Sequence, residues 1–249
     1  MAGADWGPSK YPWCAMDQQQ GLTTSQVNKA GKVLRAWTRG ELTDPAAAER
    51  ALGILLRFRA AHQYPLIKAN MGLRSMVRTE GCEVEVSQRL KRVPTILDKL
   101  QREPTMQLAN MQDIGGCRSV LSSIDEVRRV QRRLSKNRPP LRVNDYIGAP
   151  RSSGYRGVHV IVQYDGRTIE VQLRTRVMHD WAVTVERLSG RLRADLKGGA
   201  GPQQVLDLLE AISEAMALEE TGKMVDSSLV RRMNALRQAA VPYLRRGPR

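Results

Sequence analysis

The chain has 249 residues, of which 41% are hydrophobic, so it can bury the core of one domain with helical extensions. Its 40 Lys and Arg residues exceed its 25 Asp and Glu residues, which leaves a formal charge of +15. That charge favours a polyanionic partner such as nucleotide phosphates or RNA, although a solvated basic surface fits the charge alone equally well.

Cys14, Cys82 and Cys117 are widely spaced and form no CxxC or Cys/His grouping, so neither disulfides nor structural zinc are expected. The start MAGADWGPSK lacks the basic residues and apolar run of a signal peptide, and no later segment reaches a membrane-spanning length. We therefore expect a cytoplasmic protein with no membrane partner.

Residues 1 to about 20 are expected to form an irregular leader. From Asp44, an Asp cap, Pro45 at the first helical position and apolar residues at helical spacing predict an amphipathic helix. We assign 1–80 to this leader and an N-terminal helical extension.

Residues 81–195 are expected to form an α/β core, because short β-rich runs alternate there with turn residues. Two helices are predicted inside it, from Pro94 to Arg102 and from Ile124 to Lys136. A further helix is predicted through Trp181 and Val185.

The turn pair Asp165-Gly166 joins two alternating runs and predicts a β-hairpin. Counting outward places Tyr164 opposite Arg167, Ile161 opposite Glu170 and His159 opposite Gln172. One face of the hairpin is then apolar, and the other carries four polar side chains: His159, Glu170, Gln172 and Arg174. A plain solvated sheet surface is the alternative reading of that polar face.

Beyond the linker LKGGAGP, residues 202–249 are predicted to form two helices. The first carries a buried apolar stripe, made of Leu206, Leu209, Ile212, Met216 and Leu218. The stripe favours packing within the chain over an oligomer interface, and a homo-oligomer stays open. The predicted fold is α+β: a compact mixed β-sheet flanked by N- and C-terminal helices.

Four segments are rich in groups that handle phosphate and metal: Arg89-Leu90-Lys91 followed by Lys99, QDIGGCR, DYIGAPRSSGYRGVH and EVQLRT. Taken singly, each has an ordinary reading, because an Asp before a strand is often a cap and basic helix residues are often solvated. Together and in this order, from about Arg89 to Glu186, they closely resemble the synthetase domain of the RelA/SpoT homologue family. The resemblance implies a nucleotidyltransferase-like mixed sheet and transfer of the β,γ-pyrophosphate of ATP to a nucleotide 3′-hydroxyl, with Mg²⁺ and release of AMP.

By the resemblance, Asp113 and Glu170 bind Mg²⁺, and Glu170 also draws the proton from the attacking hydroxyl. The ATP-binding residues that it implies are all cationic: Arg89, Lys91, Lys99 and Arg118. Arg89 and Arg118 would sandwich the adenine, for which a planar guanidinium is suited.

For the acceptor nucleotide the resemblance implies five binding residues: Arg142, Arg151, Tyr155, His159 and Gln172. The acceptor base would stack on Tyr155, and the neighbouring Gly154 and Gly157 would give the loop freedom to close on a ligand.

Two positions on the acceptor side depart from the family pattern, where Lys is common: Asn144 and Arg151. The segment MHDWAVTVER also differs and is closer to short toxic members of the family, some of which place pyrophosphate on the 3′-CCA end of tRNA. Two versions of one activity therefore remain open: a GDP/GTP pyrophosphokinase that makes (p)ppGpp in a stringent response, and a tRNA-modifying toxin that serves in phage defence.

A third hypothesis is a catalytically inactive RNA-binding or protein-binding module, which retention of Asp113 and Glu170 disfavours. Fewer than 90 residues precede Arg89 and they hold no His-Asp pair, so no hydrolase domain is expected. Control would then come from expression, from the terminal helices, or from a neutralising antitoxin or other regulatory partner.

Overall fold

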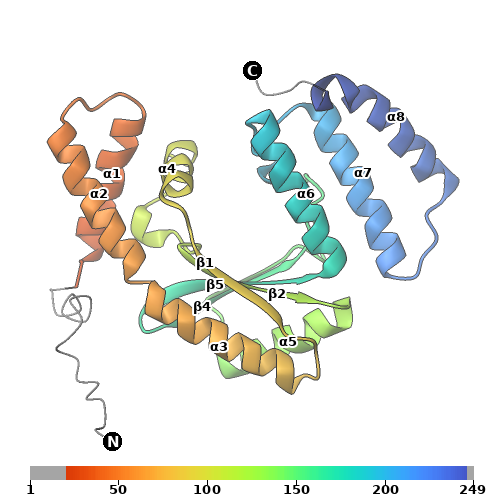
Figure 1. Cartoon of the computed structure of the whole chain (residues 1–249), viewed down its shortest axis with the longest axis horizontal. Helices are drawn as coiled ribbons and strands as arrows, with labels where there is room; N and C mark the ends of the chain where they lie inside the picture. Colours follow the sequence, from red (N-terminus) through yellow and green to blue (C-terminus); the bar gives the residue numbers. More distant parts are fainter. Residues whose placement is uncertain (1–20, 246–249) are drawn as a thin grey trace, which may run out of the picture. The chain divides into compact units, whose positions relative to one another are not determined.

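A computed structural model describes residues 21–245, so the expected leader and Cys14 lie outside the described residues. The elements follow in chain order (Figure 1): α1 (Thr24–Thr38), α2 (Pro45–Ala60), α3 (Gln63–Thr79), β1 (Glu85–Leu90), α4 (Val93–Arg102), the 3-10 helix η3 (Leu108–Asn110), β2 (Gly115–Leu121), α5 (Ile124–Asn137), β3 (Arg142–Asp145), β4 (Val158–Tyr164), β5 (Arg167–Thr175), α6 (Arg176–Leu192), the 3-10 helix η4 (Leu196–Gly198), α7 (Gln203–Glu220) and α8 (Ser227–Leu244).

The strands form one sheet in the order β1-β2-β5-β4-β3. β2 and β5 run parallel, and the other neighbours are antiparallel. The prediction of a mixed sheet with flanking helices is confirmed.

The β4–β5 hairpin has the predicted register. Asp165 and Gly166 both have positive φ, 47° and 73°, the backbone of a two-residue type I′ turn. Tyr164 pairs with Arg167, and His159 pairs with Gln172. The turn thus fixes which side chains share a face of the sheet.

The apolar face of the sheet packs on α3 and α5, on the side opposite α6 (Figure 1). The hairpin contributes Val160 and Val171, and α3 contributes Leu73, all of them buried. Cys82 and Cys117 lie in the same core as free thiols.

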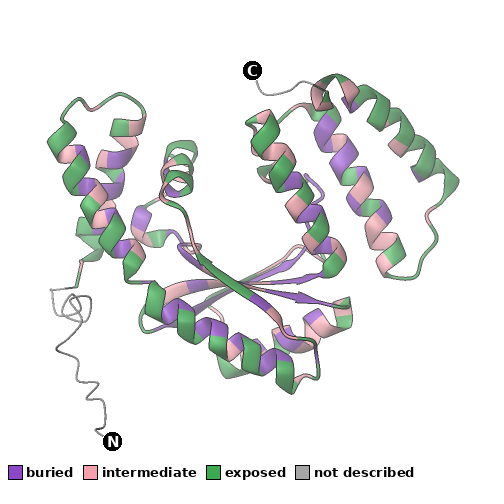
Figure 2. Cartoon of the chain, in the orientation of Figure 1, coloured by how far each residue is buried: buried purple, intermediate pink, exposed green. Residues whose placement is uncertain are grey.

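The polar face of the sheet lies under α6, η4 and α7, which build a second apolar cluster around Trp181 and Leu209. Leu206 and Leu209 of the predicted stripe are buried, and Ile212 and Met216 pack against the same cluster, so the stripe is covered within the chain. α8 is largely exposed (Figure 2), with Leu229 and Ala240 as its buried side chains.

The described residues divide into two compact units: 21–58 with Val93–Met111, and Arg59–Arg92 with 112–245. The second unit contains the whole sheet. This division rests on contacts and not on function, so the predicted functional boundaries stay predictions.

The first unit is built from α1, most of α2, α4 and η3. Thr23 and Gln26 form a capping box at the start of α1, and Asp44 Oδ1 accepts hydrogen bonds from two backbone amides at the start of α2, as predicted. Arg35 Nε donates to the carbonyl of Leu100 at 2.7 Å, which ties α1 to α4.

Within the described residues, no helix has the length and apolar character needed to cross a membrane.

Candidate active site

One face of the sheet gathers the polar side chains that the sequence singled out. Facing residues share a side, and the register pairs Gly116 with Glu170, Arg118 with Gln172 and His159 with Gln172. The residues of this polar face are Arg89, Arg118, His159, Glu170, Gln172 and Arg174.

Glu170, in the middle of β5, is held by two hydrogen bonds. His159 Nδ1 lies 2.9 Å from Oε1, and Gln172 Nε2 donates to Oε2 at 2.5 Å. Burial alone would raise the pKa of Glu170, but these bonds and the positive charge of Lys197 lower it to about 2. The carboxylate is therefore ionised at neutral pH.

A chain of hydrogen bonds continues from His159 to Tyr155. The Tyr155 hydroxyl lies 2.5 Å from His159 Nε2, and it accepts a bond from Arg174 Nε at 3.1 Å. Burial lowers the pKa of His159 and raises that of Tyr155 to about 12, so both groups are neutral at neutral pH. Tyr155 then donates to Nε2, and Nδ1–H donates to Glu170.

Tyr155 has no exposed surface in the folded chain. Lys197 Nζ lies 4.6 Å from its ring centroid and the Arg151 guanidinium lies 5.6 Å away. Because the ring is fully buried, a base can stack on it only after some of the side chains that cover it move. The acceptor role of Tyr155 stays a prediction, and it requires such a movement.

The glycines beside Tyr155 have a packing role that the sequence did not indicate. Gly154 has φ +83°, and a Cβ there would lie 2.9 Å from backbone atoms of Leu209 and Glu210 in α7. Gly157 has φ +148°, and a Cβ there would lie 3.2 Å from Arg174 Cγ. The expectation that both glycines keep the loop free to close is wrong for Gly154, because α7 holds the loop there.

The cations of this face lie close enough to affect one another. Burial lowers the pKa of Arg118, and the charges of Arg174 and Arg89 lower it further. Arg118 Nε and Arg174 Nη1 are buried without a hydrogen-bond partner among the described residues. Such donors suit an anionic ligand.

Asp113 and Lys91 form an ion pair beside the start of β2. Lys91 Nζ lies 2.7 Å from Asp113 Oδ2. The backbone of Lys91 is fixed on both sides, because its amide donates to the Ile114 carbonyl at 2.8 Å and its carbonyl accepts from Arg59 Nε at 2.7 Å. The structure thus brings together a predicted metal ligand and a predicted phosphate ligand.

The chemistry of Asp113 and Glu170 fits a magnesium ion that a nucleotide helps to hold. The described residues contain no group of three or more His, Cys, Asp or Glu side chains close enough to hold an ion by themselves. Mg²⁺ commonly binds through one or two carboxylates, with water and substrate phosphates as its other ligands. Asp113, ahead of β2, and Glu170, on the adjacent β5, would supply those carboxylates, and their role as metal ligands stays a prediction.

The other predicted residues lie in different places. Arg151 stacks on Tyr146, with its guanidinium 4.5 Å from the ring centroid, and donates to the Tyr146 hydroxyl at 2.9 Å. Arg142 opens the edge strand β3 and bonds Asn144 Oδ1 at 2.9 Å. Lys99 lies in the last turn of α4, which belongs to the first unit. Their ligand contacts stay predictions.

Three residues on or next to the polar face were given no functional role from the sequence: Arg174, Glu186 and Lys197. Lys197 Nζ lies 3.2 Å from Glu186 Oε1 and 4.6 Å from the centroid of the Tyr155 ring. Lys197 stands in LKGGAGP, which reads as a plain linker, so no local pattern marks it. Arg174 had a signal, because it shares the predicted polar face with Glu170.

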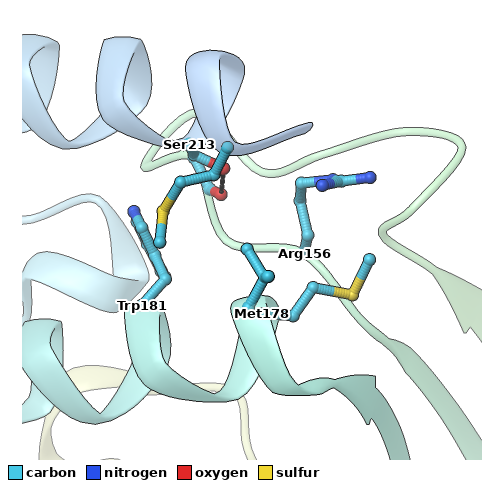
Figure 3. Close-up of a pocket in the computed structure, with 7 residues that line it drawn as sticks. Arg156, Met178, Trp181 and Ser213 are labelled. Carbon is cyan, nitrogen blue, oxygen red and sulfur yellow. Dashed lines mark hydrogen bonds between the residues drawn. The ribbon is translucent and has the colours of Figure 1, made fainter. Parts of the chain in front are cut away.

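A separate small pocket lies between the Tyr155 loop, α6 and α7 (Figure 3). Ser213 Oγ donates to the Gly154 carbonyl at its wall, and Arg156 pairs with Glu220 at 3.0 Å. Its lining is Gly154, Arg156, Val177, Met178, Trp181, Ser213 and Met216.

The six residues of the polar face lie in a segment that matches a protein-family model. Residues 88–188 match the family model described as a region found in RelA / SpoT proteins. The GTP pyrophosphokinase YjbM of Bacillus subtilis is 31% identical over an alignment 142 positions long, which covers 52% of this chain and 65% of that protein. The chain thus spans less than two thirds of that relative's own length.

Solved structures show the same fold. Small alarmone synthetase 2 from Bacillus subtilis superposes with a TM-score of 0.57 at 22% identity, covering 67% of this chain and 94% of that one. Small alarmone synthetase 1 from Bacillus subtilis, bound to its product pppGpp, gives a TM-score of 0.54 at 26% identity, covering 74% of this chain and 97% of that one.

Proposed function

We propose that the chain is a Mg²⁺-dependent pyrophosphokinase that makes (p)ppGpp, and the match of residues 88–188 to a region found in RelA / SpoT proteins supports this proposal. The 3′-oxygen of GDP or GTP forms a bond to the β-phosphorus of ATP. The bond from that phosphorus to the oxygen bridging the α- and β-phosphates breaks, and AMP leaves. The observation that carries the proposal is the ionised Glu170 among the cations of the polar face.

In this reaction Glu170 orients the 3′-hydroxyl and receives its proton as the new bond forms. His159 and Gln172 hold the carboxylate in place, since each donates to one of its oxygens. Arg89 and Arg118 bind the adenine of ATP, and Lys91 and Lys99 bind its phosphates. Asp113 and Glu170 would hold Mg²⁺, which when bound offsets the phosphate charge.

The formal charge of +15 favours a second candidate, transfer of the same group to the 3′ end of tRNA. A polyanionic acceptor gains affinity from each phosphate that a Lys or Arg neutralises. On this version the protein blocks translation, and a neutralising partner is needed in the cell.

The test is transfer of label from γ-labelled ATP in separate reactions with GDP, GTP and deacylated tRNA. Label on a guanine nucleotide supports the first version, and label on tRNA alone selects the second. Glu170→Gln is expected to lower transfer by about 100-fold or more, with Glu83→Gln, an exposed carboxylate, as the matched control. Absence of label on every acceptor with the unaltered chain would contradict both versions and favour a binding module.

A further inference from the structure

Arg174 carries a buried charge whose hydrogen-bond partners are uncharged. Its side chain is 1% exposed, with Nε donating to the Tyr155 hydroxyl and Nη2 to Gln172 Oε1. The third nitrogen, Nη1, has no hydrogen-bond partner among the described residues. A guanidinium keeps its proton, and a buried charge without a counter-charge costs free energy. Nη1 is therefore a buried donor whose hydrogen bond an anion entering the site would complete.

Lys197 brings a second cation to the same place from outside residues 88–188. Its Nζ lies 4.6 Å from the Tyr155 ring centroid and 3.2 Å from Glu186 Oε1, and its side chain is 23% exposed. The carbonyl of Lys197 accepts a bond from Ser153 Oγ at 2.9 Å, which ties η4 to the Tyr155 loop. Lys197 is thus fixed over the loop and still open to a ligand.

The two cations are close enough to oppose each other's charge. Burial, and then the charge of Arg174, lower the pKa of Lys197 to about 8. Glu186 offsets part of the charge on both cations, although neither hydrogen-bond partner of Arg174 is charged. This excess of positive charge next to Glu170 is what a phosphate group would neutralise.

We propose that Lys197 and Arg174 together hold one phosphate group of the nucleotide that binds beside Glu170. Arg174 Nη1 and Lys197 Nζ both donate to its oxygens, and Lys197 gives up part of its contact with Glu186. The proposal rests on the proposed function and adds to it two binding residues, one of them from the segment between α6 and α7.

Calorimetric titration of the full chain with three separate probes tests this: inorganic pyrophosphate, ATP and GDP. Lys197→Met, which removes the charge at similar length, is expected to weaken binding of at least one probe by about 10- to 100-fold. Lys197→Arg should restore most of the loss. Lys223→Met, which removes an exposed charge in the turn before α8, should change nothing. Loss with ATP alone places the phosphate on the donor, and loss with GDP alone places it on the acceptor.

Arg174→Lys provides a second arm, because it keeps the charge and loses the Nη1 donor. It should weaken the same probe as Lys197→Met, and circular dichroism checks that it folds. Unchanged binding of all three probes by Lys197→Met, or no binding by the unaltered chain, overturns the proposal. Binding without any transfer of label contradicts the proposed function and leaves this phosphate site standing.

Discussion

His159 Nδ1 donates to Glu170 Oε1 across the β4–β5 hairpin, over 2.9 Å. The other ring nitrogen of His159 accepts from Tyr155, so the imidazole has one fixed tautomer and one fixed orientation. The position of the Glu170 carboxylate therefore depends on the Tyr155 loop. This dependence links the predicted acceptor loop to the predicted catalytic acid.

The activity left after replacement of His159 should depend on which ring nitrogen the new side chain can imitate. An Asn side chain can present a donor near the position of Nδ1, whereas Gln presents its amide near the position of Nε2. We expect His159→Asn to retain more transfer activity than His159→Gln, by about tenfold, because only Asn can still hold Glu170. Steady-state kinetics with ATP and GDP measures this, and equal activity of the two variants would contradict the role of Nδ1.

The Lys91–Asp113 pair should matter more to activity than to stability. The pair is partly exposed, with side-chain exposures of 16% and 24%, so its loss should change the free energy of unfolding by about 1 kcal/mol or less. We expect Lys91→Met to raise the KM for ATP by about tenfold or more, since a phosphate contact is lost. Urea unfolding and kinetics on the same variant separate the two effects. Lys68→Met, which breaks the surface pair with Asp165, serves as the control.

The hairpin shows why part of the site was predictable. A two-residue turn fixes the register, and the alternation of side chains then assigns each residue to a face, so local sequence places His159 opposite Gln172. The helices that begin near Asp44, Pro94 and Ile124 were predicted for a similar reason, because caps and periodic apolar residues are local signals.

The burial of the polar face was not predictable in this way. It depends on α6, η4 and α7, which cover that face of the sheet. The contact between Lys197 and Tyr155, for example, joins residues far apart in sequence. No cap, turn or period marks a contact of that kind. For the same reason the sequence suggested a flexible role for Gly154, whose backbone lies against α7.

Gly154→Ala should destabilise the protein, while Gly190→Ala should not. At Gly154 the new methyl group would lie 2.9 Å from α7 backbone atoms and would also require a positive φ, so we expect a loss of about 2 kcal/mol or more. Gly190 lies inside α6 with nothing within 4 Å of its Cβ position, and Ala there should add about 0.5–1 kcal/mol. Urea unfolding of both variants tests the contrast. Equal stabilities would show that the loop is not held by α7.

Lys197→Met should stabilise the protein at neutral pH even though we expect it to weaken nucleotide binding. In the folded chain the pKa of Lys197 is about 8, below its ordinary value of 10.5. At pH 7 the side chain is still charged, and its burial in that state lowers the free energy of unfolding. Removal of that charge should raise the free energy of unfolding by on the order of 1–3 kcal/mol. Loss of the contact with Glu186 offsets little of this, because the Glu186 side chain is 43% exposed.

The pH dependence of the same variant gives an independent check. Between pH 8 and 10.5 the unfolded chain still holds a proton that folded Lys197 has released, so this group makes stability rise with pH. Glu170, Glu186 and Tyr155, which lie near Lys197, keep their protonation states across that window. Urea unfolding at pH 7 and pH 9.5 should therefore show a larger advantage of Lys197→Met at pH 7, and Lys223→Met should show no such difference. A variant less stable than the unaltered chain at pH 7 would mean that Lys197 supports the fold.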